Sequence, residues 1–166
     1  MLIRTSGMNE SQLEKRINVN QIDITKPVNF LVMEASFMIS SKGKDMIRLV
    51  LACFQNDFSC EPDQLKKLYD YILIDLKNDY HQMKLLKFLS SIDMREEYLS
   101  GQFDLDMISP NLSTNSFRIG SCMLKEEDTV NKEGQPIKRF VVDKYLFNNP
   151  EDFENKDVPF NDDINF

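Results

Sequence analysis

The stretch VNFLVMEASFMISSKGKDMIRLVLACFQ, residues 28–55, decides the fold of this chain. Apolar residues recur at every second position in its first twelve and in its last ten residues, which is typical of two half-buried strands. Between these strands, Gly43 supplies the permissive backbone that a compact turn requires. The sequence therefore predicts a β-hairpin with Lys42 and Lys44 at its tip.

The alternation in this hairpin also assigns side chains to faces. Arg48 and Phe54 lie on the parity of the second strand that is expected to face outward. The core-facing parity of that strand consists of Ile47, Leu49, Leu51 and Cys53. Because an aromatic side chain in a strand is buried more often than exposed, we expect Phe37, Phe88 and Phe140 to lie in the core.

A loop and a third strand are expected after the hairpin. Residues 56–67 have the composition of a turn and end in Lys66 and Lys67. The next stretch, residues 68–76, is rich in β-branched and aromatic side chains and predicts a strand. Its alternation places Tyr69 and Tyr71 on one side.

Two helical segments follow the third strand. We expect a helix over residues 80–91, capped by Asn78 or Asp79, and a shorter helical stretch over residues 94–99 that ends at Gly101. The apolar residues of the first segment follow helical spacing: Leu85, Phe88, Leu89 and Ile92.

The last third of the folded region predicts two more strands. They cover residues 116–125 and 137–147, with a turn over residues 126–136 between them. On the fifth strand, Arg139 and Tyr145 share the parity that is expected to face outward.

Charge divides the chain into a body and a tail. The 166 residues carry a net charge of −7, and residues 148–166 hold six acidic residues against one lysine. Such a segment cannot bury enough apolar surface to fold alone. We therefore expect an N-terminal arm (1–24), one domain (25–147) and a disordered acidic tail (148–166).

The cysteine count and the hydropathy pattern indicate the compartment. Cys53, Cys60 and Cys122 are odd in number and have no metal-like spacing, which favours a reduced cytoplasm. We find no stretch of apolar residues typical of a signal peptide or a membrane span. The sequence predicts a cytoplasmic protein with no membrane partner, and it is compatible with a homo-oligomer.

Residues for catalysis are sparse. His81 is the only histidine, and five glycines include no loop that could cradle a phosphate. Asp104 and Asp106 have the spacing to hold a cation, although a solvated acidic turn explains them better. We therefore expect neither an enzyme nor a cofactor or metal site.

The order of elements indicates the fold class. Three strands, a helical excursion and two further strands match a mainly β, five-stranded OB-fold barrel with a helical insertion between strands 3 and 4. A generic α+β sheet with a covering helix has the same order of elements.

Several short motifs resemble phage-encoded single-stranded DNA-binding proteins with an OB-fold. The similarity covers roughly residues 28–166. Its motifs occur in the expected order: SSKGKDMIRL (40–49), YDYI (69–72), MKLLKFL (83–89), EYLSG (97–101) and DDINF (162–166).

The end of the chain is the more specific part of this resemblance. It is similar to the Asp-Asp-Ile-Pro-Phe tip of bacterial single-stranded DNA-binding proteins, with Asn165 in place of the proline. The resemblance implies that the tail recruits replication, recombination and repair proteins and competes with DNA for its own domain. The residues that would contact the partner are Asp162, Asp163, Ile164 and Phe166.

Binding a single strand without sequence preference requires cations along the phosphates and aromatic faces on which bases stack. The outward parities and the turns of this sequence supply both. The expected DNA-binding residues are Lys42, Lys44, Arg48, Phe54, Lys66, Lys67, Tyr69, Tyr71, Arg139 and Tyr145. Because residues 1–147 are slightly acidic overall, we expect modest and salt-sensitive affinity.

Two other function classes fit parts of the sequence. The first is an adaptor that presents its acidic tail to a partner and never contacts DNA. The second is a small metal-dependent nuclease that uses paired Asp and Glu residues. DNA titration with and without the tail, and incubation of DNA with Mg²⁺, distinguish these classes from a DNA-binding protein.

Overall fold

The computed structural model describes residues 1–14, 21–55, 62–114 and 116–146. Five strands form one antiparallel sheet in the spatial order β3-β2-β1-β4-β5. The strands are β1 (Val28–Ile39), β2 (Asp45–Phe54), β3 (Lys66–Leu73), β4 (Ile119–Val130) and β5 (Pro136–Leu146). The expected disordered tail lies outside the described residues.

The hairpin of β1 and β2 forms as the sequence predicts. Gly43 has a φ of 77° in the turn, and the backbone N–H of Ser40 donates to the carbonyl of Lys44 at 2.7 Å. Lys42 and Lys44 are exposed at the tip. The expected core-facing residues of β2 are all buried: Ile47, Leu49, Leu51 and Cys53.

A β-bulge in β1 changes which of its residues face the core. Val32 lies opposite Leu51 and Glu34 lies opposite Val50, so that Met33 is the extra residue. A bulge of this kind inverts the alternation of the strand. As a result, Val32 and Ala35 are both buried in the core.

Phe37 corrects one expectation about the core. It lies opposite Ile47 on the core side of the sheet, yet 55% of it is exposed. The reason is its place near the end of β1, where it borders an open groove instead of packing beneath a helix. Of the other two rings expected in the core, Phe88 is completely buried and Phe140 is partly buried.

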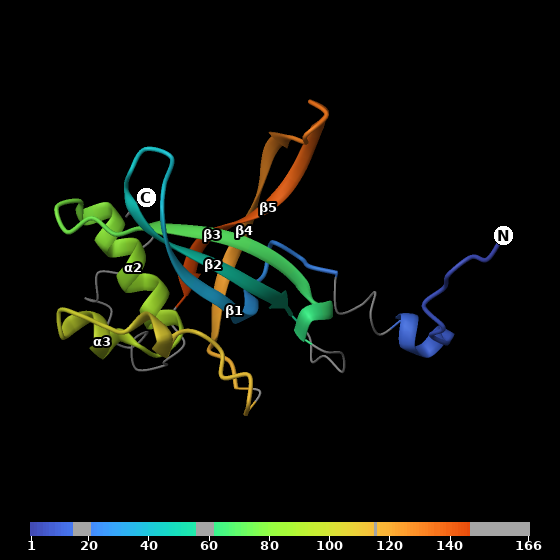
Figure 1. Ribbon diagram of the computed structural model, residues 1–166, viewed down its shortest axis with the longest axis horizontal. Coiled ribbons are helices and arrows are strands. Elements are labelled where there is room, and N and C mark those ends of the chain that lie inside the picture. The colour runs from blue at the N-terminus through green and yellow to red at the C-terminus, as the bar shows by residue number, and fades with distance from the viewer. Residues whose placement is uncertain (15–20, 56–61, 115, 147–166) are drawn as a thin grey trace.

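The helical insertion between β3 and β4 covers one face of the sheet (Figure 1). Asn78 caps α2 (Asp79–Ser91), and its side chain accepts from the N–H groups of Tyr80 and His81. A short helix, α3 (Arg95–Leu99), and a 3₁₀ turn, η2 (Leu105–Met107), complete the insertion. One further 3₁₀ turn, η1 (Pro62–Gln64), precedes β3.

An aromatic cluster joins α2 to the sheet. The ring centroids of Phe88 and Tyr145 are 5.1 Å apart, and those of Phe30 and Tyr145 are 5.8 Å apart. Phe30 packs so closely over Gly120 of β4 that a Cβ atom there would lie 2.5 Å from the ring. The cluster therefore joins α2 to the central strands β1 and β4 and to the edge strand β5.

The β4–β5 hairpin is longer than the sequence predicts. The expected turn over residues 126–136 is wrong, because β4 continues to Val130 and only residues 131–135 form the turn. Cross-strand ion pairs accompany this extension: Arg139 with Glu127 at 2.7 Å, and Lys138 with Glu126 at 3.8 Å.

A second bulge lies in β5. Leu124 is opposite Val142 and Met123 is opposite Lys144, which makes Asp143 the extra residue. The inversion turns Tyr145 to the core, where only 5% of it is exposed. The outward orientation expected of Tyr145 is therefore wrong.

The two edge strands, β3 and β5, approach each other without pairing. The Tyr145 hydroxyl donates to Asp70 of β3, and the Lys66 ammonium lies 4.1 Å from the Phe140 ring centroid. Between the described residues of β3 and β5 no backbone ladder forms, and the sheet is open. The expectation of a mainly β, five-stranded fold with a helical insertion is confirmed at this level.

The N-terminal side of β1 is attached to the domain. Ile22 and Ile24 pack against the core. The Gln55 side chain accepts from the N–H of Asp23 at 2.7 Å and donates to its carbonyl at 2.6 Å. Within the described residues no helix is long and apolar enough to cross a membrane.

Candidate functional site

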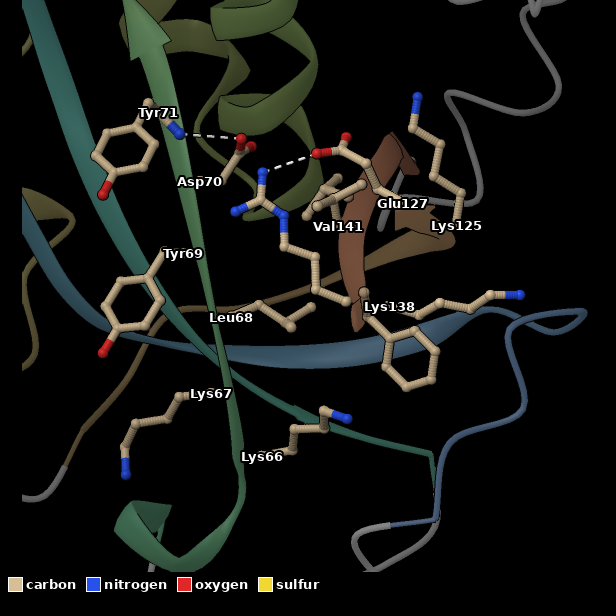
Figure 2. A pocket seen from close by; sticks show the side chains of 13 residues that line it. Lys66, Lys67, Leu68, Tyr69, Asp70, Tyr71, Lys125, Glu127, Lys138 and Val141 are labelled. Carbon is tan, nitrogen blue, oxygen red and sulfur yellow. Dashed lines mark hydrogen bonds and ion pairs between the residues drawn. The ribbon is translucent and has the colours of Figure 1, made fainter. Parts of the chain in front are cut away.

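A groove of about 660 Å³ lies between β3 on one side and β4 and β5 on the other (Figure 2). The groove exists because the edge strands β3 and β5 approach each other without backbone pairing. Hydrogen-bonded pairing of the two strands would close it. Its wall on β3 is formed by residues 66–71. The opposite wall consists of Lys125, Glu127, Lys138, Arg139, Phe140, Val141 and Val142.

Positive charge is concentrated in this groove. Five of its lining residues are cationic and two are anionic, although the whole chain has a net charge of −7. The cations are Lys66, Lys67, Lys125, Lys138 and Arg139. A local surplus of cations attracts a polyanion even when the protein as a whole is acidic.

The β3 wall carries two exposed tyrosines. Tyr69 and Tyr71 are 54% and 45% exposed, and both extend from the same side of the strand (Figure 2). They share a face because successive side chains of a strand alternate, which spaces the pair by about 6.6 Å along β3. In the same view Lys66, Leu68 and Asp70 extend from the opposite side of β3, toward Glu127 and Lys138, so the two rings border the groove on the outer side of its β3 wall. Exposed rings at the border of a cationic groove can stack with planar groups such as nucleobases.

Arg48 extends this surface onto β2. Its guanidinium carbon lies 5.0 Å from the ring centroid of Tyr69, and its Nη1 binds Glu34 Oε2 at 3.0 Å. The ion pair and the ring hold the arginine beside the groove, although Arg48 is not among the lining residues. It therefore supports the orientation of Tyr69.

Two further contacts order cations within the groove. The Lys66 ammonium lies over the Phe140 ring, so that this ring joins the two walls. Arg139 Nη2 donates to Glu127 Oε1 at 2.7 Å, as the dashed line in Figure 2 indicates. Both contacts are exposed, and an anion entering the groove would compete with Glu127 for Arg139.

A partly buried polar network supports the floor of the groove at Asp70. Lys84 of α2 donates to Asp70 Oδ1 at 2.9 Å and to the Tyr71 carbonyl at 2.9 Å. Tyr145 donates to the second oxygen of Asp70. Burial, and next the negative charge of Asp70, raise the pKa of Tyr145 well above its usual value.

The structure brings five of the ten expected DNA-binding residues into this groove: Lys66, Lys67, Tyr69, Tyr71 and Arg139. The expectation that Lys66 and Lys67 belong to a loop is wrong, because they are the first two residues of β3. Their pairing with Cys53 and Ala52 of β2 fixes them in the sheet.

Of the other five expected residues, Arg48 lies beside the groove and four lie elsewhere. Lys42 and Lys44 are at the β1–β2 turn, and Tyr145 is in the core. Phe54 is half-buried against a small cluster that includes Leu31 and Leu65. The expected partner-binding residues of the tail lie outside the described part of the chain: Asp162, Asp163, Ile164 and Phe166.

Eight groove residues were not anticipated as site residues, and three of these are cationic or aromatic: Lys125, Lys138 and Phe140. Lys138 and Phe140 lie on one parity of β5, and this alternation of a cation with a ring was the available signal. Lys125 could be assigned to the groove only once the pairing of the strands was known, because β4 pairs with β5 at this residue.

The described residues give little support to a nucleophilic thiol or to a metal site. Burial raises the pKa of the Cys53 thiol to about 12 and raises that of Cys122 as well, which disfavours a reactive thiolate. No three His, Cys, Asp or Glu side chains of the described residues gather as metal ligands.

The comparisons with known proteins add no relative. No family model matches this chain, and no curated protein matches it.

Proposed function

We propose that this protein is an OB-fold single-stranded DNA-binding protein of the phage type, which coats single strands without sequence preference and catalyses no reaction. The strand would lie in the groove between β3 and β5. Its phosphates would contact the lysines and Arg139, and its bases would stack on Tyr69 and Tyr71.

The shape of the sheet supports the fold assignment. An OB-fold is a five-stranded, partly open barrel. Here a five-stranded antiparallel sheet curves until Tyr145 of β5 binds Asp70 of β3. A barrel that is incompletely closed at this seam agrees with both the strand order and the groove.

One observation carries the functional proposal: five cations and two exposed tyrosines line the same groove. A sequence-independent site for a single strand requires this combination, because cations neutralise phosphates and rings accept any base. A site for a small neutral ligand would not need five cations.

The tail completes the proposed function. By its similarity to bacterial tips, the segment 148–166 would recruit replication, recombination and repair proteins through Asp162, Asp163, Ile164 and Phe166. An acidic segment without a strong tendency to fold suits binding to a basic partner pocket. The protein would act in the cytoplasm of a bacterial host.

The test is a titration of fluorescein-labelled oligo-dT of about 20 nucleotides with the full chain, followed by anisotropy. The groove variant is Tyr69→Ala with Tyr71→Ala. The matched control is Tyr80→Ala, because Tyr80 is exposed on α2 and does not line the groove. Stacking contributes about 1–3 kcal/mol per base, so the double variant should bind at least about tenfold more weakly.

Salt provides the second readout. If several of the five groove cations neutralise phosphates, affinity should fall steeply with salt, with a slope of about −0.7 per neutralised phosphate. If neither the full chain nor a truncation after residue 147 binds at low salt, the proposal is wrong and the adaptor function gains support. Cleavage of the DNA in Mg²⁺ would favour a nuclease instead.

A further inference from the structure

A second groove, of about 490 Å³, lies where the end of β1 and the start of β2 meet the helical insertion. Phe37 of β1, Leu76 and Phe103 contribute to its lining, together with Tyr98 of α3. Leu76 is 83% exposed, and Phe37 more than half. Exposed apolar surface that is gathered in a concavity usually marks an interaction site.

The lining of this groove differs from that of the groove between β3 and β5. None of its eleven lining residues carries a charged side chain. Its polar groups include Tyr98, whose hydroxyl donates to Gln82 Oε1 at 3.1 Å. Such a lining offers nothing to a phosphate and suits apolar side chains.

The charged residues that flank the lining of this apolar groove in sequence are more often acidic than basic. Asp75, Glu97, Asp104 and Asp106 are each adjacent in sequence to a lining residue. The charge of Asp79 adds to burial in raising the pKa of Tyr98. Among the described residues none of these five carboxylates forms an ion pair with a lysine or an arginine.

Cations near the apolar groove are fewer. Lys84 and Arg48 are also adjacent to lining residues, but they pair with Asp70 and Glu34. Lys77, which follows Leu76, is the remaining lysine or arginine next to a described lining residue. Among the residues that flank the lining in sequence, carboxylates therefore outnumber the cations that have no carboxylate partner, and a cationic partner would neutralise this negative charge.

We propose that this groove binds an amphipathic segment of another protein, with an apolar face and flanking Lys or Arg residues. The apolar side chains would fill the space beside Phe37 and Leu76, and the cations would lie against the carboxylates, as in a helix bound in a groove. The chain's own tail does not fit, since residues 148–166 hold six acidic residues and one lysine. This binding is independent of what the groove between β3 and β5 holds.

The probe is a synthetic, fluorescein-labelled peptide of about four helical turns, with Leu at helical i, i+3, i+4 and i+7 spacing and Lys elsewhere. We expect saturable binding to the full chain by anisotropy. Leu76→Glu should weaken it about tenfold or more, because a carboxylate would enter the apolar groove. The matched control is Leu112→Glu, since Leu112 is 80% exposed and lies outside the groove.

Charge is tested separately. The double variant Glu97→Lys with Asp106→Lys should also weaken peptide binding. Added salt should reduce the difference in peptide affinity between this variant and the unaltered chain. Circular dichroism of each variant verifies that the fold persists.

Four outcomes would overturn the inference. They are equal binding of a scrambled peptide, tighter binding of a Lys→Glu peptide, no effect of Leu76→Glu, and tighter binding of a peptide with the sequence of residues 148–166. Sedimentation supplies a fifth: self-association that Leu76→Glu abolishes would identify a second copy of the chain as the occupant.

Discussion

The hydroxyl of Tyr145 on β5 donates a hydrogen bond to the carboxylate of Asp70 on β3. This contact joins the two edges of an open sheet, and Lys84 of α2 binds the other oxygen of the same carboxylate. One side chain thus connects the helix, the first edge and the last edge at the floor of the groove.

Replacing the donor tests the contribution of this contact. Tyr145→Phe keeps the ring against Phe30 and Phe88 and removes only the hydroxyl. Hydrogen bonds to charged groups contribute about 1.5–3 kcal/mol, and we expect a loss of that size in the free energy of unfolding by urea. Tyr98→Phe is the control, because its hydroxyl binds the neutral Gln82 and should cost only about 0.5–1.5 kcal/mol. Equal losses would contradict the special role of Asp70.

Alkaline pH should destabilise the protein. Burial raises the pKa of Tyr145 well above its usual value of about 10 and raises that of Cys53 to about 12. Their stabilising effect is complete below the unfolded pKa values and is lost as the pH rises above them, because the unfolded chain then releases protons more readily. The urea concentration at the midpoint of unfolding should therefore decrease as the pH rises above about 9. In Tyr145→Phe the decline should be shallower; a midpoint that rises with pH would refute the assignment.

Gly120 tests the packing of Phe30. A Cβ atom at residue 120 would lie 2.5 Å from the Phe30 ring and 2.9 Å from the Ser91 carbonyl oxygen. Gly120→Ala should lower the free energy of unfolding by about 1–3 kcal/mol, the usual effect of overpacking, as measured by urea denaturation. Combining it with Phe30→Leu should give a loss smaller than the sum of the two single losses, because the smaller side chain relieves the contact. Strict additivity would mean that the ring is not the obstacle.

The sequence predicted regular alternation well and its interruptions poorly. The hairpin, the N-terminal cap of α2 and the apolar face with Phe88 follow from local sequence patterns, which a single sequence contains. The bulges at Met33 and Asp143 each insert one residue, and no residue type marks them. Every side chain beyond a bulge changes face, which explains why Tyr145 is buried.

The groove was predicted in part for a similar reason. Tyr69 and Tyr71 lie along one predicted strand, so alternation was enough to group them, whereas Lys66 and Lys67 were expected in the preceding loop. Lys125 and Lys138 join them only because the β4–β5 hairpin approaches β3, which lies far from that hairpin in the sequence. For Phe37, alternation could not predict the exposure of the side chain, because this depends on how far the helical insertion extends over the sheet.

Glu127 offers a change that should strengthen the proposed DNA binding. It is one of two anions lining the groove, and it binds Arg139 at 2.7 Å. Glu127→Gln would remove a negative charge and leave Arg139 available to a phosphate. Exposed ion pairs contribute about 0.2–1 kcal/mol, so the dissociation constant for oligo-dT should fall by up to about fivefold, as measured by anisotropy at low salt.

The matched control for this change is Glu133→Gln. Glu133 is exposed in the turn between β4 and β5 and does not line the groove, yet its replacement changes the net charge equally. If both variants strengthen binding to the same extent, overall charge and not the groove governs affinity. If Glu127→Gln weakens binding, then Glu127 orients Arg139 toward the strand instead of competing with it. Only a selective gain for Glu127→Gln that shrinks with added salt agrees with a phosphate at Arg139, since screening reduces exposed charge interactions.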